Sequence, residues 1–412
     1  MKYKQIHTSQ LDKNNLYLKM KSNAESSHLS KRASRISGLG AIHALNKAKQ
    51  LEQEGYDIIH LEAGELDHDT PQHIIQSAKR SLYDGKTRYT STQGTLTLRE
   101  SVACHIYSSR NVSCSPSDVI ITPGVKSGIF FTILAIIDPG DEVIIQDPSF
   151  PSYSAITSLA EGKPIMWSQS PASGYNYDID KLSSLINPKT KLIILNDPAN
   201  PTGNIMKKST IESIAELAIK NDLWVLTDEI YSQLYFDGIV PYSILSVPSM
   251  KDRTILLDGF SKTYAMTGWR LGYGIYPQRL IEPVCSLMLN NHSCIPEFIQ
   301  DAGIAALNGP QHFVEQLRTE LSNRRMLVCE TITKARNLSC HTPSGALYVM
   351  IDISKTHSPE AISFTEGLLS SGVSLLPGTM ISENCTSQVR LAYTVAKPIL
   401  STALQRIESF VN

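Results

Sequence analysis

The stretch TILLDGFSKTYAMTGWRLGY, residues 254–273, opens with an almost continuous apolar run and places Ser261 and Lys262 directly after it. An apolar run of this kind predicts a strand that is buried on both faces, as in a parallel sheet. A lysine at the end of such a strand is unusual, because lysines are mostly exposed. Taken alone, Lys262 is most simply an ordinary surface residue, so its meaning depends on what lies beside it.

Other segments repeat this pattern of an apolar run that ends in polar residues or glycine. They are DVIITPG (118–124), DEVIIQDP (141–148), KLIILNDP (191–198), LWVLTDEIY (223–231) and LGYGIY (271–276). Helical patterns, such as residues 128–138 and 209–222, lie between several of them. Apolar strands that alternate with helices predict an α/β fold with a large three-layer domain and a mostly parallel sheet.

The two ends of the chain have a different pattern. Residues 41–54 have a helical period, and YDIIHLEAG (56–64) is typical of a short strand. After residue 310, a long charged helical pattern leads into GALYVMIDI (345–353) and VRLAYTV (389–395), which predicts a smaller α+β domain. We therefore expect a flexible arm (1–30), a first part of the small domain (31–65), a large domain (66–310) and the rest of the small domain (311–412).

Composition excludes several classes of partner. The chain of 412 residues has 38 lysines and arginines against 39 acidic residues, a net charge of −1, which argues against nucleic acid or an anionic membrane. Seven cysteines without a C-x-x-C pair predict reduced thiols and no metal site. The N-terminus is polar, without a signal-peptide core, and the longest apolar stretch, 129–137, is too short to span a bilayer. We expect a cytoplasmic protein.

The polar clusters after the strands predict a ligand site. In open α/β sheets, ligands bind outside the carboxyl ends of the strands. Lys262 would lie on that rim, where its amine could form a Schiff base with a carbonyl. Ser261 and Arg270 flank Lys262, and a hydroxyl and a guanidinium suit a phosphate. The turn TPGVKSG between a strand and a helix could offer the same phosphate its main-chain amides at Gly124, Val125 and Lys126.

Further residues of the predicted rim suit a planar, charged ligand. Asp228 ends an apolar run and could hold a protonated ring nitrogen or, equally, cap a helix. Tyr231 and Asn200 could hydrogen-bond a ring oxygen, and Phe150 could stack on the ring. Arg390, inside an apolar run, requires a carboxylate partner. Each residue alone has a simpler structural explanation, but together they describe a pyridoxal-phosphate site.

The motifs that carry these residues resemble those of the class I/II aminotransferases, which are fold-type I pyridoxal-phosphate enzymes, close to the prokaryotic aspartate/aromatic branch. GFSKTYAMTGWRLG (259–272) matches the lysine signature of that family over its whole length. NDPANPTG (196–203) and TDEIY (227–231) match two further motifs in the same order. Weaker matches are LEAGELDHDTP (61–71), RYTSTQGTLTLRE (88–100) and PSGALY (343–348).

The resemblance implies an aminotransferase that moves an amino group between an L-amino acid and a 2-oxo acid by a ping-pong mechanism. It implies that Lys262 carries pyridoxal 5′-phosphate as an internal aldimine and that Asp228 protonates the ring. The other implied cofactor ligands are Gly124, Val125, Lys126, Phe150, Asn200, Tyr231, Ser261 and Arg270. Arg390, with Asn200 and the main chain at Gly64, would bind the substrate carboxylate. Tyr89 would reach the phosphate of a neighbouring subunit, which implies a homodimer with shared sites.

Transamination has three alternatives. A β-lyase, racemase or synthase on the same fold would use nearly identical residues, so the sequence separates it poorly from an aminotransferase. A transcription regulator would need an N-terminal DNA-binding module, and only about 30 residues precede the matched region. An α/β-hydrolase would need G-x-S-x-G, but Lys262 follows Ser261 instead. The amino donor is not defined, because the chain departs from the family at Leu66, His68 and Leu347.

Overall fold

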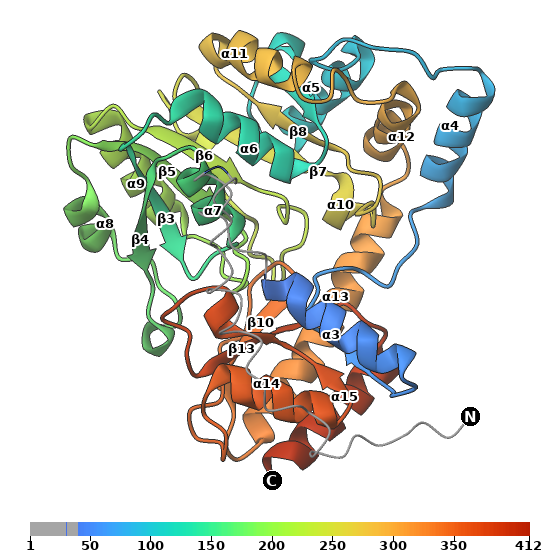
Figure 1. Cartoon of the computed structure of the whole chain (residues 1–412). Coiled ribbons are helices and arrows are strands. Elements are labelled where there is room, and N and C mark those ends of the chain that lie inside the picture. The colour runs from blue at the N-terminus through green and yellow to red at the C-terminus, as the bar shows by residue number, and fades with distance from the viewer. Residues whose placement is uncertain (1–29, 31–39) are drawn as a thin grey trace.

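The computed structural model describes residue 30 and residues 40–412. Figure 1 shows a larger part, with helices on both faces of a sheet, above a smaller part that contains the C-terminus. The expected arm at residues 1–30 lies outside the described residues apart from Ser30. Within the described residues, no helix is both long and apolar enough to cross a membrane.

A seven-stranded sheet, in the order β2-β8-β7-β6-β5-β3-β4, forms the middle of the larger part. Only β8 runs against its neighbours, and the other strands share one direction, so the expected mostly parallel sheet is confirmed. The strands are β2 (Val119–Thr122), β3 (Glu142–Asp147), β4 (Lys163–Ser168), β5 (Thr190–Asn196), β6 (Trp224–Asp228), β7 (Thr254–Gly259) and β8 (Gly272–Ile275).

Strand β4 was missed by the sequence reasoning. It is an edge strand, paired only with β3, and several of its side chains are exposed or half-buried. Its sequence, KPIMWS, contains a lysine and a proline, which are common at sheet edges and weaken the apolar signal of a strand.

Side chains alternate between two packed faces of the sheet, which produces the three layers. On one face, Val143, Ile145 and Ile194 belong to the main core, which also receives side chains from α6, α7, α11 and α13. On the other face, Ile144 and Ile193 pack with α8 and α9, and the β2–β8 end packs with α4, α5 and α12. These helices are α4 (Gln72–Tyr83), α5 (Leu96–Arg110), α6 (Val125–Ile136), α7 (Ser152–Leu159), α8 (Ile179–Leu185), α9 (Lys208–Lys220), α11 (Gln278–Leu289), α12 (Glu297–Asn308) and α13 (His312–Lys334).

The smaller part is built on a four-stranded antiparallel sheet in the order β12-β13-β10-β9. The early strand β1 pairs in parallel with β11, so a segment before the larger part joins the C-terminal segments. These elements are α3 (Gly40–Gln53), β1 (Ile59–His60), β9 (Ser339–Cys340), β10 (Tyr348–Asp352), α14 (Ala361–Ser370), β11 (Val373–Ser374), β12 (Leu376–Pro377), β13 (Gln388–Ala392) and α15 (Lys397–Val411).

Helix α13 runs alongside both parts and is tied to them by buried arginines (Figure 1). Arg324 Nη1 lies 2.9 Å from Asp67 Oδ1, and Arg325 Nη1 lies 2.7 Å from Asp237 Oδ2. Helix α13 confirms the long helix expected after residue 310. Its buried arginines form ion pairs with segments that are far away in the sequence.

Candidate active site

Lys262 lies on the one-turn helix α10 (Phe260–Thr263), which follows β7 directly. Its ammonium Nζ donates a hydrogen bond to the main-chain oxygen of Gly64, at 2.5 Å. A Cβ atom at Gly64 would lie 1.9 Å from the Tyr348 hydroxyl, so only glycine allows the chain to pass so close. The segment around Gly64 is thereby brought against the lysine from almost 200 residues away.

The start of helix α6 lies against Arg270. Gly124 is the N-cap, with a φ of 78°, and a Cβ there would lie 2.5 Å from Arg270 Nη2. Val125 and Lys126 are the first residues of the helix, so their N–H groups have no partner within it. Arg270 itself has a φ of 53°, and its Nη1 donates to the Thr267 oxygen at 2.7 Å. Free amides beside a guanidinium make this corner suitable for an anion.

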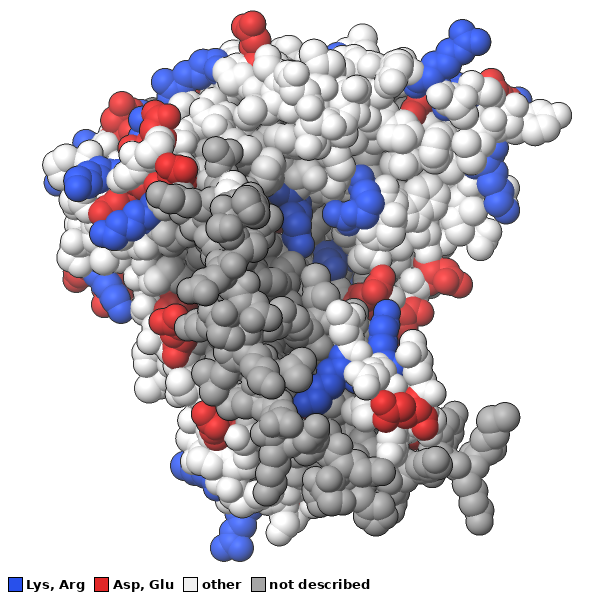
Figure 2. Space-filling view, in the orientation of Figure 1, with Lys and Arg blue, Asp and Glu red and all other residues white. Residues whose placement is uncertain are grey.

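Three cationic side chains lie near one another at this corner. The pKa of Lys126 is lowered from its ordinary value, first by partial burial of its ammonium group and then by the charges of Arg270 and Lys262. The Lys126 ammonium also lies 5.2 Å from the centre of the Phe150 ring. Figure 2 shows lysine and arginine side chains gathered in a hollow of the surface between the two parts of the molecule. An anion bound there would relieve the mutual repulsion.

Asp228 is the last residue of β6, and its side chain is buried. Tyr153 Oη donates to its Oδ2 at 2.8 Å, and the Ile230 N–H donates to its Oδ1 at 3.2 Å. Burial raises the pKa of this carboxyl to about 7, the two hydrogen bonds lower it in part, and the nearby Asp258 and Glu229 carboxylates raise it. The residue caps a turn rather than a helix, since residues 229–233 are not helical. A cationic ligand group would stabilise its ionised form.

A chain of hydrogen bonds connects Asp228 to Arg390. Asn196 Nδ2 donates to the Asp228 main-chain oxygen at 2.9 Å, and the Asn200 N–H donates to Asn196 Oδ1 at 2.7 Å. Arg390 Nη1 donates to Asn200 Oδ1 at 2.9 Å. Because Oδ1 of Asn200 accepts this bond, its Nδ2 is left to donate to a ligand.

Arg390 lies in the middle of β13 with its side chain buried. Its Nη2 donates to the Glu62 main-chain oxygen at 2.6 Å, and its guanidinium lies 4.3 Å from the centre of the Tyr348 ring. Burial lowers the pKa of the guanidinium from its ordinary value. Its Nε is buried without a hydrogen-bond partner. A buried cation with an unused donor calls for an anionic ligand.

The model of the family "Aminotransferase class I and II" matches residues 56–407 of the chain. The chain belongs to this family. An aspartate aminotransferase from Musicola paradisiaca is 33% identical over 91% of the chain and 94% of its own length. An aspartate/prephenate aminotransferase from Thermus thermophilus is 34% identical over 92% of the chain and 97% of its own length. The expected aminotransferase and its cofactor, pyridoxal phosphate, are therefore confirmed.

Solved aminotransferase structures share the fold over most of the chain. The aspartate aminotransferase of Thermus thermophilus with maleate has a TM-score of 0.89 at 34% identity and covers 93% of the chain and 99% of its own. An aromatic aminotransferase from Pyrococcus horikoshii OT3 has a TM-score of 0.83 at 34% identity and covers 88% and 98%. The chain is thus an α/β protein with the fold-type I arrangement of pyridoxal-phosphate enzymes.

Two tyrosines outside the expected set contact expected site residues. Tyr348 Oη lies 3.0 Å from Tyr231 Oη. Burial is the main reason why the pKa of Tyr231 is raised well above its ordinary value, and the neighbouring Tyr348 hydroxyl raises it further. Tyr153 holds Asp228, and its ring meets the Phe150 ring edge-on, with centroids 5.7 Å apart. Tyr348 lies within PSGALY, one of the weaker motif matches, and Tyr153 follows shortly after the run DEVIIQDP.

Most of the expected site residues lie close to one another within one copy of the chain, but Tyr89 is an exception. Lys262, Arg270 and Lys126 lie close enough for their charges to interact, and Asp228, Asn200 and Arg390 belong to one hydrogen-bond chain. Ser261 is buried beside Lys262. Tyr89, in contrast, is 89% exposed.

Proposed function

We propose that the chain transfers an amino group from an L-amino acid to a 2-oxo acid in two half-reactions at one site, a ping-pong mechanism with Lys262 as the central residue. The observation that best supports this proposal is the hydrogen-bond chain from Arg390 through Asn200 and Asn196 to Asp228. It joins a guanidinium suited to a substrate carboxylate with the main chain of Asp228, whose side-chain carboxyl suits a ring nitrogen.

The residues present fit pyridoxal phosphate at its phosphate end. Because residue 124 is a glycine, the space between its main chain and Arg270 stays free, whereas any side chain at this position would fill it. The amides of Val125 and Lys126, the Ser261 hydroxyl and the Arg270 guanidinium would bind the phosphate oxygens. When bound, the cofactor supplies an aldehyde that condenses with amines and a pyridine ring that accepts electrons.

The residues also fit the ring. Asp228 would hold a proton on the pyridine nitrogen, because its buried carboxyl lacks a cationic partner among the described residues. Asn200 Nδ2 and Tyr231 Oη would donate to the ring oxygen, and Phe150 would cover one face of the ring. Arg390, with the main chain at Gly64, would orient the substrate through its carboxylate. Lys262 would then remove and return the proton at the substrate Cα.

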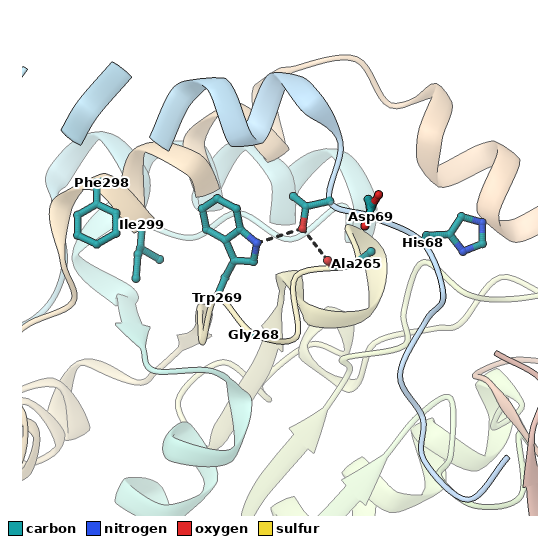
Figure 3. A pocket seen from close by; sticks show the side chains of 8 residues that line it. His68, Asp69, Ala265, Gly268, Trp269, Phe298 and Ile299 are labelled. Atoms are coloured by element: carbon teal, nitrogen blue, oxygen red, sulfur yellow. Dashed lines mark hydrogen bonds between the residues drawn. The ribbon is translucent and has the colours of Figure 1, made fainter. Parts of the chain in front are cut away.

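We also propose a homodimer, located in the cytoplasm, in which Tyr89 completes the site of a second copy. Beside α10, an open hollow of about 470 Å³ is lined in part by Trp269, Phe298 and Ile299 (Figure 3). Thr70 Oγ1 fixes its wall by accepting from Trp269 Nε1 at 3.0 Å and donating to the Ala265 oxygen at 2.7 Å. An open hollow lined by aromatic and aliphatic as well as polar side chains, together with the exposed Tyr89 ring, supports a second chain as its occupant.

The half-reaction tests this function. Purified protein with pyridoxal phosphate is mixed with single L-amino acids, including aspartate, phenylalanine and arginine, and the conversion of the cofactor to its pyridoxamine form is followed by absorbance. Conversion, reversed by a 2-oxo acid, is expected for at least one donor. If cystathionine, added as a further amino acid, is instead split to a thiol, pyruvate and ammonia without an oxo acid, a lyase is supported. If no donor converts the cofactor, transamination is wrong.

A further inference from the structure

Arg110, the last residue of α5, lies in a group of buried charges that none of the assigned roles uses. Its Nε donates to Glu229 Oε2 at 2.6 Å, and its Nη2 donates to Asp258 Oδ2 at 2.5 Å. The side chain of Arg110 is only 5% exposed, and those of its two partners are 6% and 3% exposed. We refer to Arg110, Glu229 and Asp258 as the Arg110 cluster.

The Arg110 cluster is fully hydrogen-bonded. Glu229 Oε1 accepts from Ser243 Oγ at 2.6 Å, and Asp258 Oδ2 also accepts from Ser232 Oγ at 3.0 Å. Burial works to lower the pKa of Arg110, but the charges of Glu229 and Asp258 raise it above its ordinary value. The guanidinium is therefore always charged, and a satisfied network of this kind admits a single geometry.

The two carboxylates of the Arg110 cluster are each connected to a direct sequence neighbour of a proposed cofactor residue. Glu229 directly follows Asp228 in the chain. Ser232, which is bonded to Asp258, directly follows Tyr231.

The third connection leads to the lysine. Asp258 Oδ1 accepts the Gly259 N–H at 2.6 Å, and Gly259 is the N-cap of the one-turn helix that carries Lys262. The ends of β6 and β7 and the turn after β6 are thus all fixed by one guanidinium that comes from a different helix.

We propose that Arg110 is a positioning residue of the cofactor site and, through Glu229 and Asp258, sets the relative positions of Asp228, Tyr231 and Lys262. The proposal rests on the function proposed above for those three residues. A purely structural role is a poorer explanation, because buried ion pairs can often be replaced by apolar side chains without loss of stability.

The Arg110 cluster also acts on Asp228 through its charge. With both carboxylates ionised it carries one more negative than positive charge; burial raises the pKa of Asp258, and the Arg110 guanidinium acts in the opposite direction. Burial is the main cause of the raised pKa of Asp228, and the Asp258 and Glu229 carboxylates raise it further. The same surplus would favour a cationic group bound to Asp228.

Arg110→Lys tests the proposal, because a single ammonium keeps the charge but does not span both carboxylates as the guanidinium fork does. The matched control is Arg253→Lys, since Arg253 Nη1 lies 3.0 Å from Asp222 Oδ1 at the opposite end of β7. Cofactor affinity is measured by titrating the apoprotein with pyridoxal phosphate, and kcat and KM are measured with the best donor. We expect Arg110→Lys to lower kcat about 100-fold and to weaken cofactor binding, with little change in KM. Arg253→Lys should match the wild type.

Glu229→Gln is the second variant, and it decides the question if Arg110→Lys does not fold. It keeps the shape of the side chain but removes one of the two negative charges that hold Arg110. We expect kcat to fall about tenfold and cofactor binding to weaken. Wild-type cofactor affinity and kcat in every variant that folds would overturn the proposal. If the wild type itself converts no donor, the proposed function fails, whereas the cofactor affinities still decide the role of Arg110.

Discussion

The Tyr153 hydroxyl donates a 2.8 Å hydrogen bond to the buried carboxylate of Asp228. This bond favours the ionised carboxylate, yet burial prevails and raises the pKa of Asp228 to about 7 from an ordinary value of 3.8. Between these two pH values, the protein without its cofactor therefore keeps a proton on Asp228 that the unfolded chain has lost. The relationship matters for the reaction, because a cationic ring nitrogen would reverse this balance.

The first prediction concerns the pH dependence of apoprotein stability. Between about pH 4 and pH 7 the folded state binds the Asp228 proton and the unfolded state does not, so the contribution of Asp228 to stability falls as the pH rises. The loss is complete above pH 7 and amounts to about 4 kcal/mol. Asp228→Asn has no such proton, so its stability relative to the wild type should increase over this range.

Thermal unfolding of the two apoproteins at pH 5 and pH 8 measures this difference. A gap between variant and wild type that does not change with pH would contradict the prediction. With pyridoxal phosphate bound, the wild type should no longer lose stability relative to Asp228→Asn, since the ring cation offsets the carboxylate.

The second prediction concerns Lys262. Lys262→Ala should abolish the absorbance of the lysine-bound cofactor and lower turnover by more than about 100-fold, because the residue that moves the substrate proton is lost. The unfolding temperature should change little, since the ammonium makes one hydrogen bond, to the Gly64 oxygen. Lys208→Ala is the control, because Lys208 is exposed and its contacts are Glu212 on its own helix and the Tyr242 ring. Near-normal turnover in Lys262→Ala would rule out the assignment.

The third prediction concerns the substrate carboxylate. Arg390→Ala should raise KM for carboxylate substrates, because each lost charged hydrogen bond costs roughly 1.5–3 kcal/mol, or about 10- to 150-fold. Cofactor binding should change much less, since Arg390 contacts Asn200 but not the predicted phosphate corner. Arg80→Ala, which removes an exposed partner of Asp84, serves as the control for loss of an arginine. An unchanged KM would show that Arg390 does not bind the carboxylate.

Much of the fold could be predicted from the sequence because the strands of the large sheet are buried on both faces. Their side chains, such as those of Ile144 and Ile145, pack on opposite layers, so each strand is a continuous apolar run. Strand β4 lacks this burial and with it the signal. The polar residues after the strands could be predicted as rim residues for the same reason, since their positions follow from the ends of the runs.

The contacts between distant segments could not be predicted in this way. Tyr348 meets Tyr231 across 117 positions, and Arg110 meets Asp258 across 148. No periodicity within either segment specifies such a partner, because each contact depends on how the layers and the two parts pack. The role of Asn196 was missed for a related reason. Its side chain links the Asp228 main chain to Asn200, and this requires two adjacent parallel strands in register.

The last prediction concerns Gly64. Its Cβ position lies 1.9 Å from the Tyr348 hydroxyl and 2.6 Å from the ring carbon that bears it, so Gly64→Ala must displace either the main chain or the ring. Displacement of the main chain would move the oxygen that accepts from Lys262. Overpacking of this kind costs typically about 1–3 kcal/mol of stability. We expect kcat to fall as well, because both neighbours belong to the proposed site.

Gly268→Ala is the control for stability, because a Cβ at Gly268 would meet no atom of its own chain within 4 Å and the residue is not in the left-handed region. Since Gly268 lines the hollow proposed for a second chain, the two variants are compared by denaturant unfolding, and the kinetics of Gly64→Ala are compared with the wild type. Adding Tyr348→Phe to Gly64→Ala removes the hydroxyl but leaves the ring carbon, so it should restore part of the stability. Equal behaviour of Gly64→Ala and Gly268→Ala would show that the close approach of Gly64 to Tyr348 is not required.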